Sequence, residues 1–285
     1  MIKINTKVLM SGVDYFSVEE LNPYSNANIQ PNLENTKEEY FSLQKLFSQA
    51  GIEIVSVHAP EGCQDGVYTA NWALCRDNKA IIANLPNMRT AEIPYAKKAL
   101  IGLGFEIIDP PKGLRFSGQG DALPCGDYVF AGNGYRSDAQ MHTFVADKLG
   151  YKVISLQTVP ALDENGMPII NKITGWADSF FYDIDLAISI LSTDLIAWCP
   201  QAFDEASQDI ISSLPMDKIE VSLQEATESF ACNLLSTGEM VIMSATAPEL
   251  TANIEAKGLK VLTPDMTELS KGGGYIRCTT LTLSN

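Results

Sequence analysis

The sequence predicts an α/β protein assembled from one repeated unit, in which strands flank a single helix. Two observations support this prediction. Short segments that alternate apolar and polar residues, as half-buried strands do, recur at 52–55, 105–108, 151–154, 219–222 and 259–262. A helix-like segment precedes each of them, and four of these five segments directly follow a glycine, namely Gly51, Gly104, Gly150 and Gly258. Glycine is favoured there because the chain adopts positive φ where a helix ends.

The remaining elements fit the same unit. Helices are expected upstream of the five strands, at 37–50, 93–103, 137–149, 204–214 and 249–257. Further apolar strands are expected between the units, at 79–85, 127–131, 194–197 and 240–244. Repetition at about 40 to 70 residues favours a radial or stacked array, since each unit needs neighbours to cover its apolar faces. A closed ring of five units meets this need, and an open α/β sheet is the alternative.

Composition narrows the class of protein. The chain has 285 residues, 46% hydrophobic and 19% charged, with no low-complexity linker, so one domain over residues 1–285 is expected. Its apolar runs are far shorter than the roughly 18 to 20 residues that cross a bilayer, and its N-terminus lacks a secretory pattern. We therefore expect a cytoplasmic protein without a membrane partner. The formal charge of −15 argues against a nucleic-acid partner, which requires a basic surface.

The cysteines and glycines give no sign of a cofactor. Six cysteines are scattered along the chain without a C-x-x-C pair, at positions 63, 75, 125, 199, 232 and 278. Neither a disulfide framework nor a zinc site is indicated by this spacing, and no glycine loop has the spacing that cradles phosphate. No metal or organic cofactor is expected. The sequence is compatible with a homo-oligomer.

The segment 271–281 is the first candidate for chemistry. Its three consecutive glycines, 272–274, permit a close backbone approach to a ligand, and Cys278 then begins an expected Thr/Leu-rich strand. Arg277 beside it, or a bound cation, could favour the thiolate that nucleophilic chemistry requires. The alternative is a flexible turn before a buried structural cysteine.

Carboxylates form the second group of candidates. Asp121 lies in the glycine-spaced turn 116–123, where it could present a carboxylate or simply make an Asx-turn with its own backbone. Asp183 and Asp185 lie in an expected strand, 181–186, whose alternation would place both on one face. Such a pair binds a cation or hinders its own ionisation. A solvated edge strand is the alternative.

Basic residues are few. Arg89 and Arg136 stand at expected loop-to-helix junctions, and the planar fork of arginine suits a carboxylate, although surface salt bridges are its commoner use. The only histidines, His58 and His142, have no adjacent nucleophile and are interpreted as structural.

Further motifs run along nearly the whole chain, at 8–24, 65–71, 118–121, 134–136, 181–186, 199–203, 231–233 and 272–278. In their residues and their order, these motifs resemble the amidinotransferase and dimethylarginine dimethylaminohydrolase family of the guanidine-modifying superfamily. The resemblance implies a five-bladed, pseudo-symmetric α/β propeller of ββαβ units. This agrees with the five strand repeats found from the pattern alone.

The resemblance also implies a reaction and a site. In this family a C-terminal cysteine attacks the guanidinium carbon, acidic residues hold the guanidinium nitrogens, and a histidine moves protons. By position the implied residues are Cys278 as the nucleophile, Asp121 and Asp185 as the guanidinium-holding carboxylates, Arg89 and Arg136 as the clamp on an α-carboxylate, and Asn22 as another substrate-side residue.

Three positions distinguish the chain within the family. Asn71 resembles the arginine dihydrolase branch, which releases both terminal nitrogens and leaves ornithine. Asp183 stands where the family has its catalytic histidine, the residue that titrates near neutral pH. It could move protons if burial and its neighbour Asp185 favoured its protonated form. Ser117 replaces a glutamate that is usual in dihydrolases.

Three functions are compatible with this sequence. The first is a thiol-dependent hydrolase of arginine or a related guanidino compound, with a covalent amidino intermediate on Cys278. The second is an amidinotransferase, which passes the same group to an amine. The third is a non-catalytic protein that binds a guanidine or amino acid, since Asp183 replaces the histidine. Each has a small-molecule guanidino partner.

Overall fold

The computed structural model describes residues 2–19, 26–85, 87–172 and 175–284. Its strands are β1 (Lys7–Ser11), β2 (Glu53–Val57), β3 (Ala73–Arg76), β4 (Lys79–Ile82), β5 (Glu106–Ile108), β6 (Ala122–Cys125), β7 (Tyr128–Gly132), β8 (Lys152–Leu156), β9 (Ile188–Ser192), β10 (Leu195–Trp198), β11 (Asp217–Glu220), β12 (Leu235–Ser236), β13 (Met240–Ile242), β14 (Lys260–Leu262) and β15 (Leu281–Ser284). Its α-helices are α1 (Leu33–Gln49), α2 (Ile93–Gly102), α3 (Gln140–Leu149), α4 (Glu205–Ser213), α5 (Leu223–Glu228) and α6 (Pro248–Ala256).

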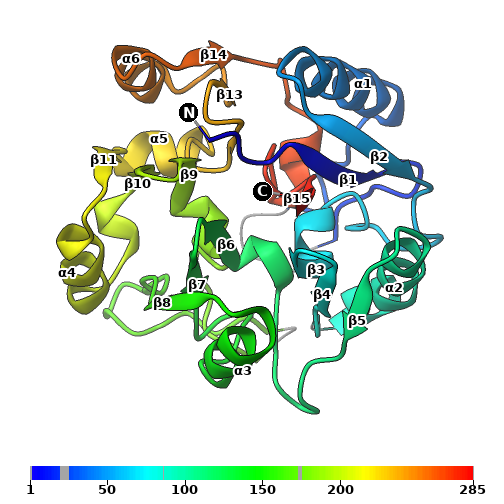
Figure 1. Ribbon diagram of the computed structural model, residues 1–285, viewed down its shortest axis with the longest axis horizontal. Helices are drawn as coiled ribbons and strands as arrows, with labels where there is room; N and C mark the ends of the chain where they lie inside the picture. The colour runs from blue at the N-terminus through cyan, green and yellow to red at the C-terminus, as the bar shows by residue number, and fades with distance from the viewer. Residues whose placement is uncertain (1, 20–25, 86, 173–174, 285) are drawn as a thin grey trace.

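The described strands form five separate three-stranded sheets, with the orders β15-β1-β2, β3-β4-β5, β6-β7-β8, β9-β10-β11 and β12-β13-β14. The sheets surround a common centre, and α1, α2, α3, α4 and α6 lie outside them (Figure 1). The predicted ring of five units is therefore confirmed, and the alternative of one open sheet is wrong.

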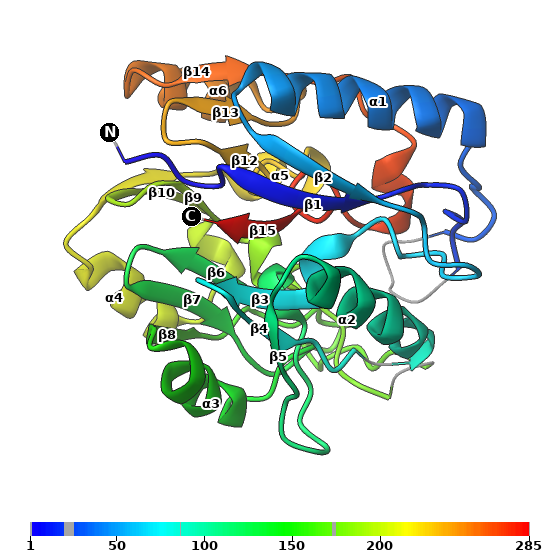
Figure 2. The ribbon, with the colours of Figure 1, turned by 45° about the vertical axis from the view of Figure 1, so that its right-hand side comes forward.

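Each sheet is one ββαβ unit. In the third sheet, β6 pairs antiparallel with β7, and β7 pairs parallel with β8 through the crossover helix α3. A parallel pair needs such a long connection, whereas an antiparallel pair does not. The first sheet draws on both ends of the chain, because β15 pairs antiparallel with β1 while β1 pairs parallel with β2. Figure 2 shows β1 and β15 side by side, where the C-terminal strand closes the ring.

The predicted helices and outer strands are confirmed. Helix α1 begins four residues before the predicted start, because the side chain of Asn32 accepts hydrogen bonds from the backbone N–H groups of Glu34 and Asn35, both at 3.1 Å. Gly150 ends α3 in the left-handed region with φ 71°. The other three predicted helix-end glycines also have positive φ: Gly51, Gly104 and Gly258. Helix α5 was not predicted.

Two sequence-based expectations about strands are wrong. Segment 181–186 is a turn followed by the 3₁₀ helix Ile184–Leu186, and Cys278 lies in a turn three residues before β15. The inner strands β3, β6, β9 and β12 were not recognised. Their residues are mostly buried, as in β9, where all five are, so they lack the apolar–polar alternation that marks a half-exposed strand.

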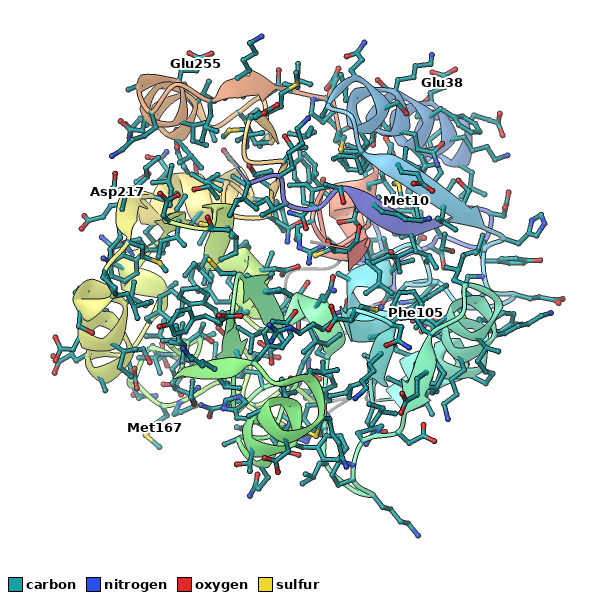
Figure 3. All side chains as sticks on the ribbon, viewed as in Figure 1. Met10, Glu38, Phe105, Met167, Asp217 and Glu255 are labelled. Atoms are coloured by element: carbon teal, nitrogen blue, oxygen red, sulfur yellow. The ribbon has the colours of Figure 1, made fainter. Side chains whose placement is uncertain are left out.

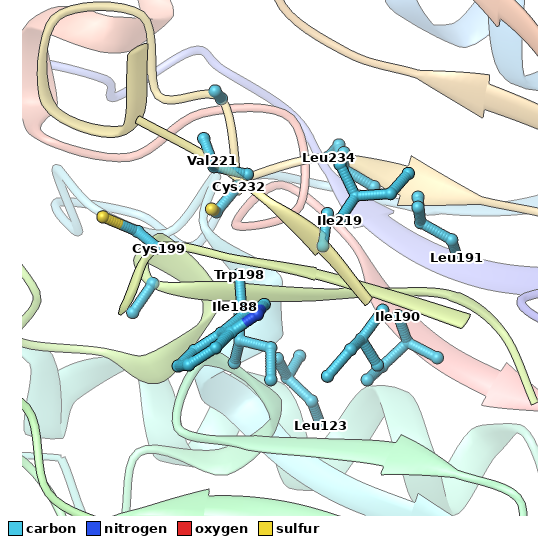
Figure 4. Packing of buried hydrophobic residues seen from close by; sticks show 14 of the residues in the cluster. Leu123, Ile188, Ile190, Leu191, Trp198, Cys199, Ile219, Val221, Cys232 and Leu234 are labelled. Carbon is cyan, nitrogen blue, oxygen red and sulfur yellow. The ribbon is translucent and has the colours of Figure 1, made fainter. Parts of the chain in front are cut away.

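The apolar core fills the space between neighbouring sheets. In Figure 4, Leu123 of β6, Ile188 of β9 and Ile219 of β11 pack in one cluster. Figure 3 labels Met10 on β1, which is buried, and Glu38 on α1 and Glu255 on α6, which are exposed on the outer helices. No helix of the described residues is long and apolar enough to cross a membrane.

Candidate active site

A polar residue precedes the inner strand of every sheet. Asn71 lies two residues before β3, Asp121 one before β6, Asp185 three before β9, Asn233 two before β12 and Cys278 three before β15. All five are buried. Because the five inner strands surround one centre (Figure 1), these turns bring their polar side chains into one region.

Cys278 is held by a network of hydrogen bonds. Its sulfur lies 3.4 Å from Oδ2 of Asp185 and accepts a hydrogen bond from Nδ2 of Asn233 at 3.1 Å. Its backbone N–H donates to Oδ1 of Asn233 at 3.2 Å. Asn233 therefore fixes both the backbone and the sulfur of the cysteine. Sequence reasoning missed it as a site residue, although its place before an apolar inner strand matches that of the other four.

Burial favours the protonated forms of these groups. It raises the pKa of the Cys278 thiol well above its ordinary value, and the Asp185 carboxylate adds to the shift. It also raises the pKa of Asp185 to about 8, with a further contribution from the charge of Asp183, while Arg277 opposes the shift. The pKa of Asp121 is likewise raised well above its usual range by burial and by Asp183. A cation entering the site would favour the charged forms of all three groups.

Asp183 lies beside the pair formed by Cys278 and Asp185. Its Oδ2 accepts hydrogen bonds from Nδ2 of Asn71 at 2.8 Å and from Nη1 of Arg136 at 3.2 Å. Asn71 also donates to Oγ of Ser117 at 2.9 Å. The Oδ1 atoms of Asp183 and Asp185 are buried, and no described residue donates a hydrogen bond to either. Buried carboxylate oxygens that lack a hydrogen-bond donor favour a cationic ligand that can donate hydrogen bonds to them.

The two predicted clamp arginines both lie close to the carboxylate cluster. Arg89 donates to Glu92 through Nε at 2.8 Å and Nη2 at 3.0 Å, and its Nη1 donates to Oδ1 of Asn71 at 2.8 Å. The guanidinium of Arg136 lies 4.0 Å from the ring centroid of Tyr182. Both arginines are thus paired with carboxylates of the protein itself. Their role as a clamp remains a prediction.

Two further sequence-based candidates, Asp121 and Asn22, and one carboxylate that was not predicted, Asp65, remain to be placed. Oδ1 of Asp121 accepts a hydrogen bond from the backbone N–H of Ile184 at 3.1 Å, which joins two of the central turns. Asp65 is a carboxylate that sequence reasoning did not single out; burial raises its pKa to about 6, although Arg89 opposes the shift. Asn22 lies outside the described residues.

The glycine run before Cys278 approaches a tyrosine of the protein itself. A Cβ atom on Gly272 or Gly274 would lie 2.4 Å or 2.6 Å from atoms of Tyr68. The hydroxyl of Tyr68 donates to the carbonyl of Leu269 at 2.5 Å, and that of Tyr182 donates to the carbonyl of Gly273. These contacts fix the loop that carries the cysteine.

Neither histidine belongs to this cluster. His58 is exposed after β2, and a ring nitrogen of His142 on α3 lies 3.1 Å from the carbonyl oxygen of Gly132. Across the described ranges, no group of three or more His, Cys, Asp or Glu side chains could hold a metal ion.

A ring of five ββαβ units with a cysteine and carboxylates at its centre defines the pentein class, the guanidine-modifying α/β propellers. The family described as N,N dimethylarginine dimethylhydrolase, eukaryotic, matches residues 126–284. The chain belongs to that family, since the match covers more than half of it.

Characterised relatives are similar over almost the whole chain. The bifunctional arginine dihydrolase/ornithine cyclodeaminase AgrE of Nostoc sp. is 28% identical over 281 residues, 96% of this chain and 37% of that protein. The N(G),N(G)-dimethylarginine dimethylaminohydrolase of Mycobacterium tuberculosis is 29% identical over 265 residues, 92% of this chain and 80% of that protein. The chain thus spans little more than a third of the bifunctional relative.

Among solved structures, the N-terminal domain of ArgZ, a cyanobacterial arginine dihydrolase crystallised with its product, matches with a TM-score of 0.87 and 28% identity over 97% of each chain. A variant of that domain has been solved covalently bound to a reaction intermediate. This likeness confirms the five-bladed propeller.

Proposed function

We propose that the protein is a thiol-dependent hydrolase of arginine or a related guanidino compound, with a covalent amidino intermediate on Cys278. One observation carries the proposal: the sulfur of Cys278 lies 3.4 Å from a carboxylate oxygen of Asp185 and 3.1 Å from the amide of Asn233. A nucleophile within hydrogen-bond reach of a base is the arrangement that covalent catalysis requires. The dihydrolase and dimethylaminohydrolase activities named for the relatives support a guanidino substrate.

The first half of the reaction forms the intermediate. A bound guanidinium favours ionisation of the carboxylates and the thiol. The thiol proton passes to Asp185 as the S–C bond to the guanidinium carbon forms. A C–N bond then breaks, and the departing nitrogen takes the proton from Asp185. An amidino group remains on the sulfur.

The second half releases the product. Water adds to the same carbon and gives one proton to Asp185, and the C–S bond breaks. The proton returns to the sulfur, so the thiol is restored. Asn233 supports both halves because its Nδ2–H group can donate to the sulfur when it is anionic.

Proton transfer is assigned to Asp185 on geometric grounds. The sequence suggested Asp183 for this task, but Asp185 is the carboxylate in contact with the sulfur, and proton transfer needs that contact. Asp183 remains in the proposal as the carboxylate beside Asn71 and Arg136 that faces the guanidinium. Asp121 lies near enough to Asp183 and Asp185 to share in holding the cation.

Product analysis tests the proposal. The purified protein is incubated with arginine, methylated arginines, agmatine and other guanidines, and ammonia and organic products are followed by mass spectrometry. We expect turnover of at least one guanidine, and its complete loss in Cys278→Ser. The matched control is Cys125→Ser, because Cys125 is a buried cysteine of β6 whose sulfur donates only to backbone carbonyls near 3.6–3.7 Å, a role that serine can take. Equal turnover in Cys278→Ser and the wild type contradicts the proposal.

The same assay separates the alternatives. A product that appears only when an amine acceptor is added identifies an amidinotransferase. The replacement of the family's histidine by Asp183 favours the alternative of a non-catalytic protein that binds a guanidine or amino acid. Tight binding of a guanidine without any product, together with turnover restored by Asp183→His, identifies a binding protein.

The pH dependence tests the role of Asp185. The value of kcat/KM reports the ionisation of groups in the free enzyme, and Asp185 accepts a proton only when ionised. Because the pKa of Asp185 is raised to about 8, we expect kcat/KM to rise with pH through that region. A profile that is flat from pH 6 to 9 excludes Asp185 as the base.

A further inference from the structure

The charges around the proposed site are unbalanced. Among the described residues, five carboxylates gather there against three guanidinium groups: Asp65, Glu92, Asp121, Asp183 and Asp185 against Arg89, Arg136 and Arg277. Burial favours the protonated forms of Asp121 and Asp185 in the empty site, but a bound cation favours their ionisation, and with all five ionised a single guanidinium leaves one excess negative charge. Uncompensated buried charge is costly, so a ligand that brings a second positive charge is favoured.

Asp183 adds one negative charge to this site, because it stands where the resembled family has a histidine. It is 1% exposed, and its Oδ1 has no hydrogen-bond donor among the described residues. Its Oδ2 holds Arg136, the arginine predicted to bind a substrate carboxylate. An incoming carboxylate would therefore have to share this guanidinium with Asp183, at close range to a like charge.

Arg89, the other arginine of the predicted clamp, is also paired with carboxylates of the protein. Arg89 forms a two-point contact with Glu92 and lies 3.8 Å from Asp65. Such bidentate pairs are among the stronger hydrogen-bonded ion pairs. Neither arginine therefore offers an uncompensated positive charge to an anion.

A cavity on the far side of Arg89 continues this acidic character. It has a volume of about 180 Å³, and its described lining includes the carboxylates of Asp65 and Glu92 beside the guanidinium of Arg89. Two hydrogen bonds of 2.8 Å connect it to the cluster, from Arg89 to Asn71 and from Asn71 to Asp183. A substrate whose guanidinium is held at Asp183 and whose far end reaches this cavity would therefore place that end among carboxylates.

We propose that the site selects a guanidine whose far end is an amine without a carboxylate, an ω-guanidino amine, over arginine. The proposal rests on the guanidine-hydrolase function above and specifies its substrate class. The carboxylate cluster receives the guanidinium, and the cavity lined by Asp65 and Glu92 receives the ammonium.

Calorimetric binding to the Cys278→Ser variant tests this selection, because that variant binds without turnover. Agmatine and arginine are matched probes, since they differ only by the carboxylate. We expect agmatine to bind at least about tenfold more tightly, which is the effect of about 1.4 kcal/mol. In an added Asp183→Asn background the preference should fall, because Arg136 is released and one negative charge is removed.

Asp217→Asn is the control for the change of charge. Asp217 lies on β11, its side chain is 70% exposed, and it pairs with Lys257. This variant should keep the wild-type ratio of the two affinities. A preference for arginine, or equal affinities, overturns the selection while leaving the hydrolase intact. Binding of neither probe overturns this proposal, whereas turnover of another guanidine by the wild type would still sustain the hydrolase.

Discussion

At the scale of single residues, Asn233 determines how Cys278 is presented. It accepts from the cysteine's backbone N–H and donates to its sulfur, and its Nδ2 also lies 3.4 Å from the backbone carbonyl oxygen of Asp185. A donor beside a buried thiolate offsets part of the cost of its charge. Asn233 is thus a positioning residue that ties the nucleophile to the turn that carries its base.

Asn233→Ala should slow the reaction of Cys278 with iodoacetamide. Hydrogen bonds to charged groups contribute about 1.5–3 kcal/mol, so the alkylation rate near pH 8 should fall roughly tenfold or more. Asn233→Asp keeps the shape but adds a negative charge, and should slow it further. The rate is followed by mass spectrometry of the peptide that contains Cys278, so no substrate is needed.

A second asparagine provides the comparison for this experiment. The side chain of Asn133 donates a hydrogen bond to Oγ of Ser155 on β8 at 3.3 Å, far from the cysteine loop in the sequence, and Asn133→Ala should alkylate like the wild type. Unchanged alkylation in Asn233→Ala would refute the role given to Asn233.

At the scale of elements, the turns before the inner strands determine the site. The loop before β15 packs against Tyr68, and the Cβ of an alanine at position 274 would lie 2.6 Å from that ring. Gly274→Ala must therefore displace the ring or the loop. Overpacking of this kind costs about 1–3 kcal/mol. We expect a lower urea midpoint and a lower kcat, because the same loop carries Cys278.

Gly102 is the matched glycine for this substitution. It ends α2 with no atom within 4 Å of an added Cβ, and its φ is not positive. Because alanine is the better helix former, Gly102→Ala should leave the midpoint unchanged or raise it. Equal midpoints for the two variants would show that the loop tolerates the ring contact.

The sequence predicts the outer part of each unit better than its centre. Helices such as α3 carry an amphipathic pattern and a terminal glycine, and outer strands such as β8 alternate, so both are readable locally. The inner strand β9 is buried throughout and carries no such pattern. The 3₁₀ helix Ile184–Leu186 shows the same limit, because its burial is set by the assembled ring.

The site residues divide in the same way, into those that the sequence could indicate and those that depend on the assembled ring. Cys278, Asp121 and Asp185 could be placed by resemblance, and the structure brings all three to the centre. Asn233 and Asp65 could not, since a single polar residue in a turn has no distinctive spacing. The pairing of Arg136 with Asp183 depends on residues 47 positions apart. Such contacts arise only when the sheets meet.

At the scale of the whole molecule, the ring holds buried acids inside a strongly acidic protein of formal charge −15. Burial raises the pKa of Asp65 to about 6 and that of Asp185 to about 8, whereas an unfolded aspartate titrates near about 3.9. The folded state therefore binds more protons than the unfolded state across this range. The stabilisation that these groups contribute is fully present below about pH 4 and is lost as pH rises through about 6 and then about 8.

The free energy of unfolding, measured with urea in the absence of ligand, should accordingly fall between pH 5 and 9. For Asp185 the fall approaches about 1.4 kcal/mol per pH unit between about pH 5 and 7, and it is half as steep at the folded pKa of about 8. Repulsion within the acidic chain acts in the same direction, so the slope alone does not identify Asp185. Asp185→Asn removes its ionisation and should flatten the fall between pH 5 and 9, most of all below pH 8. Asp217→Asn removes the same formal charge from an exposed ion pair with Lys257 and should keep the wild-type slope. If the two variants run parallel to each other, the pH dependence comes from overall charge and the buried carboxyl at the centre of the ring plays no special part.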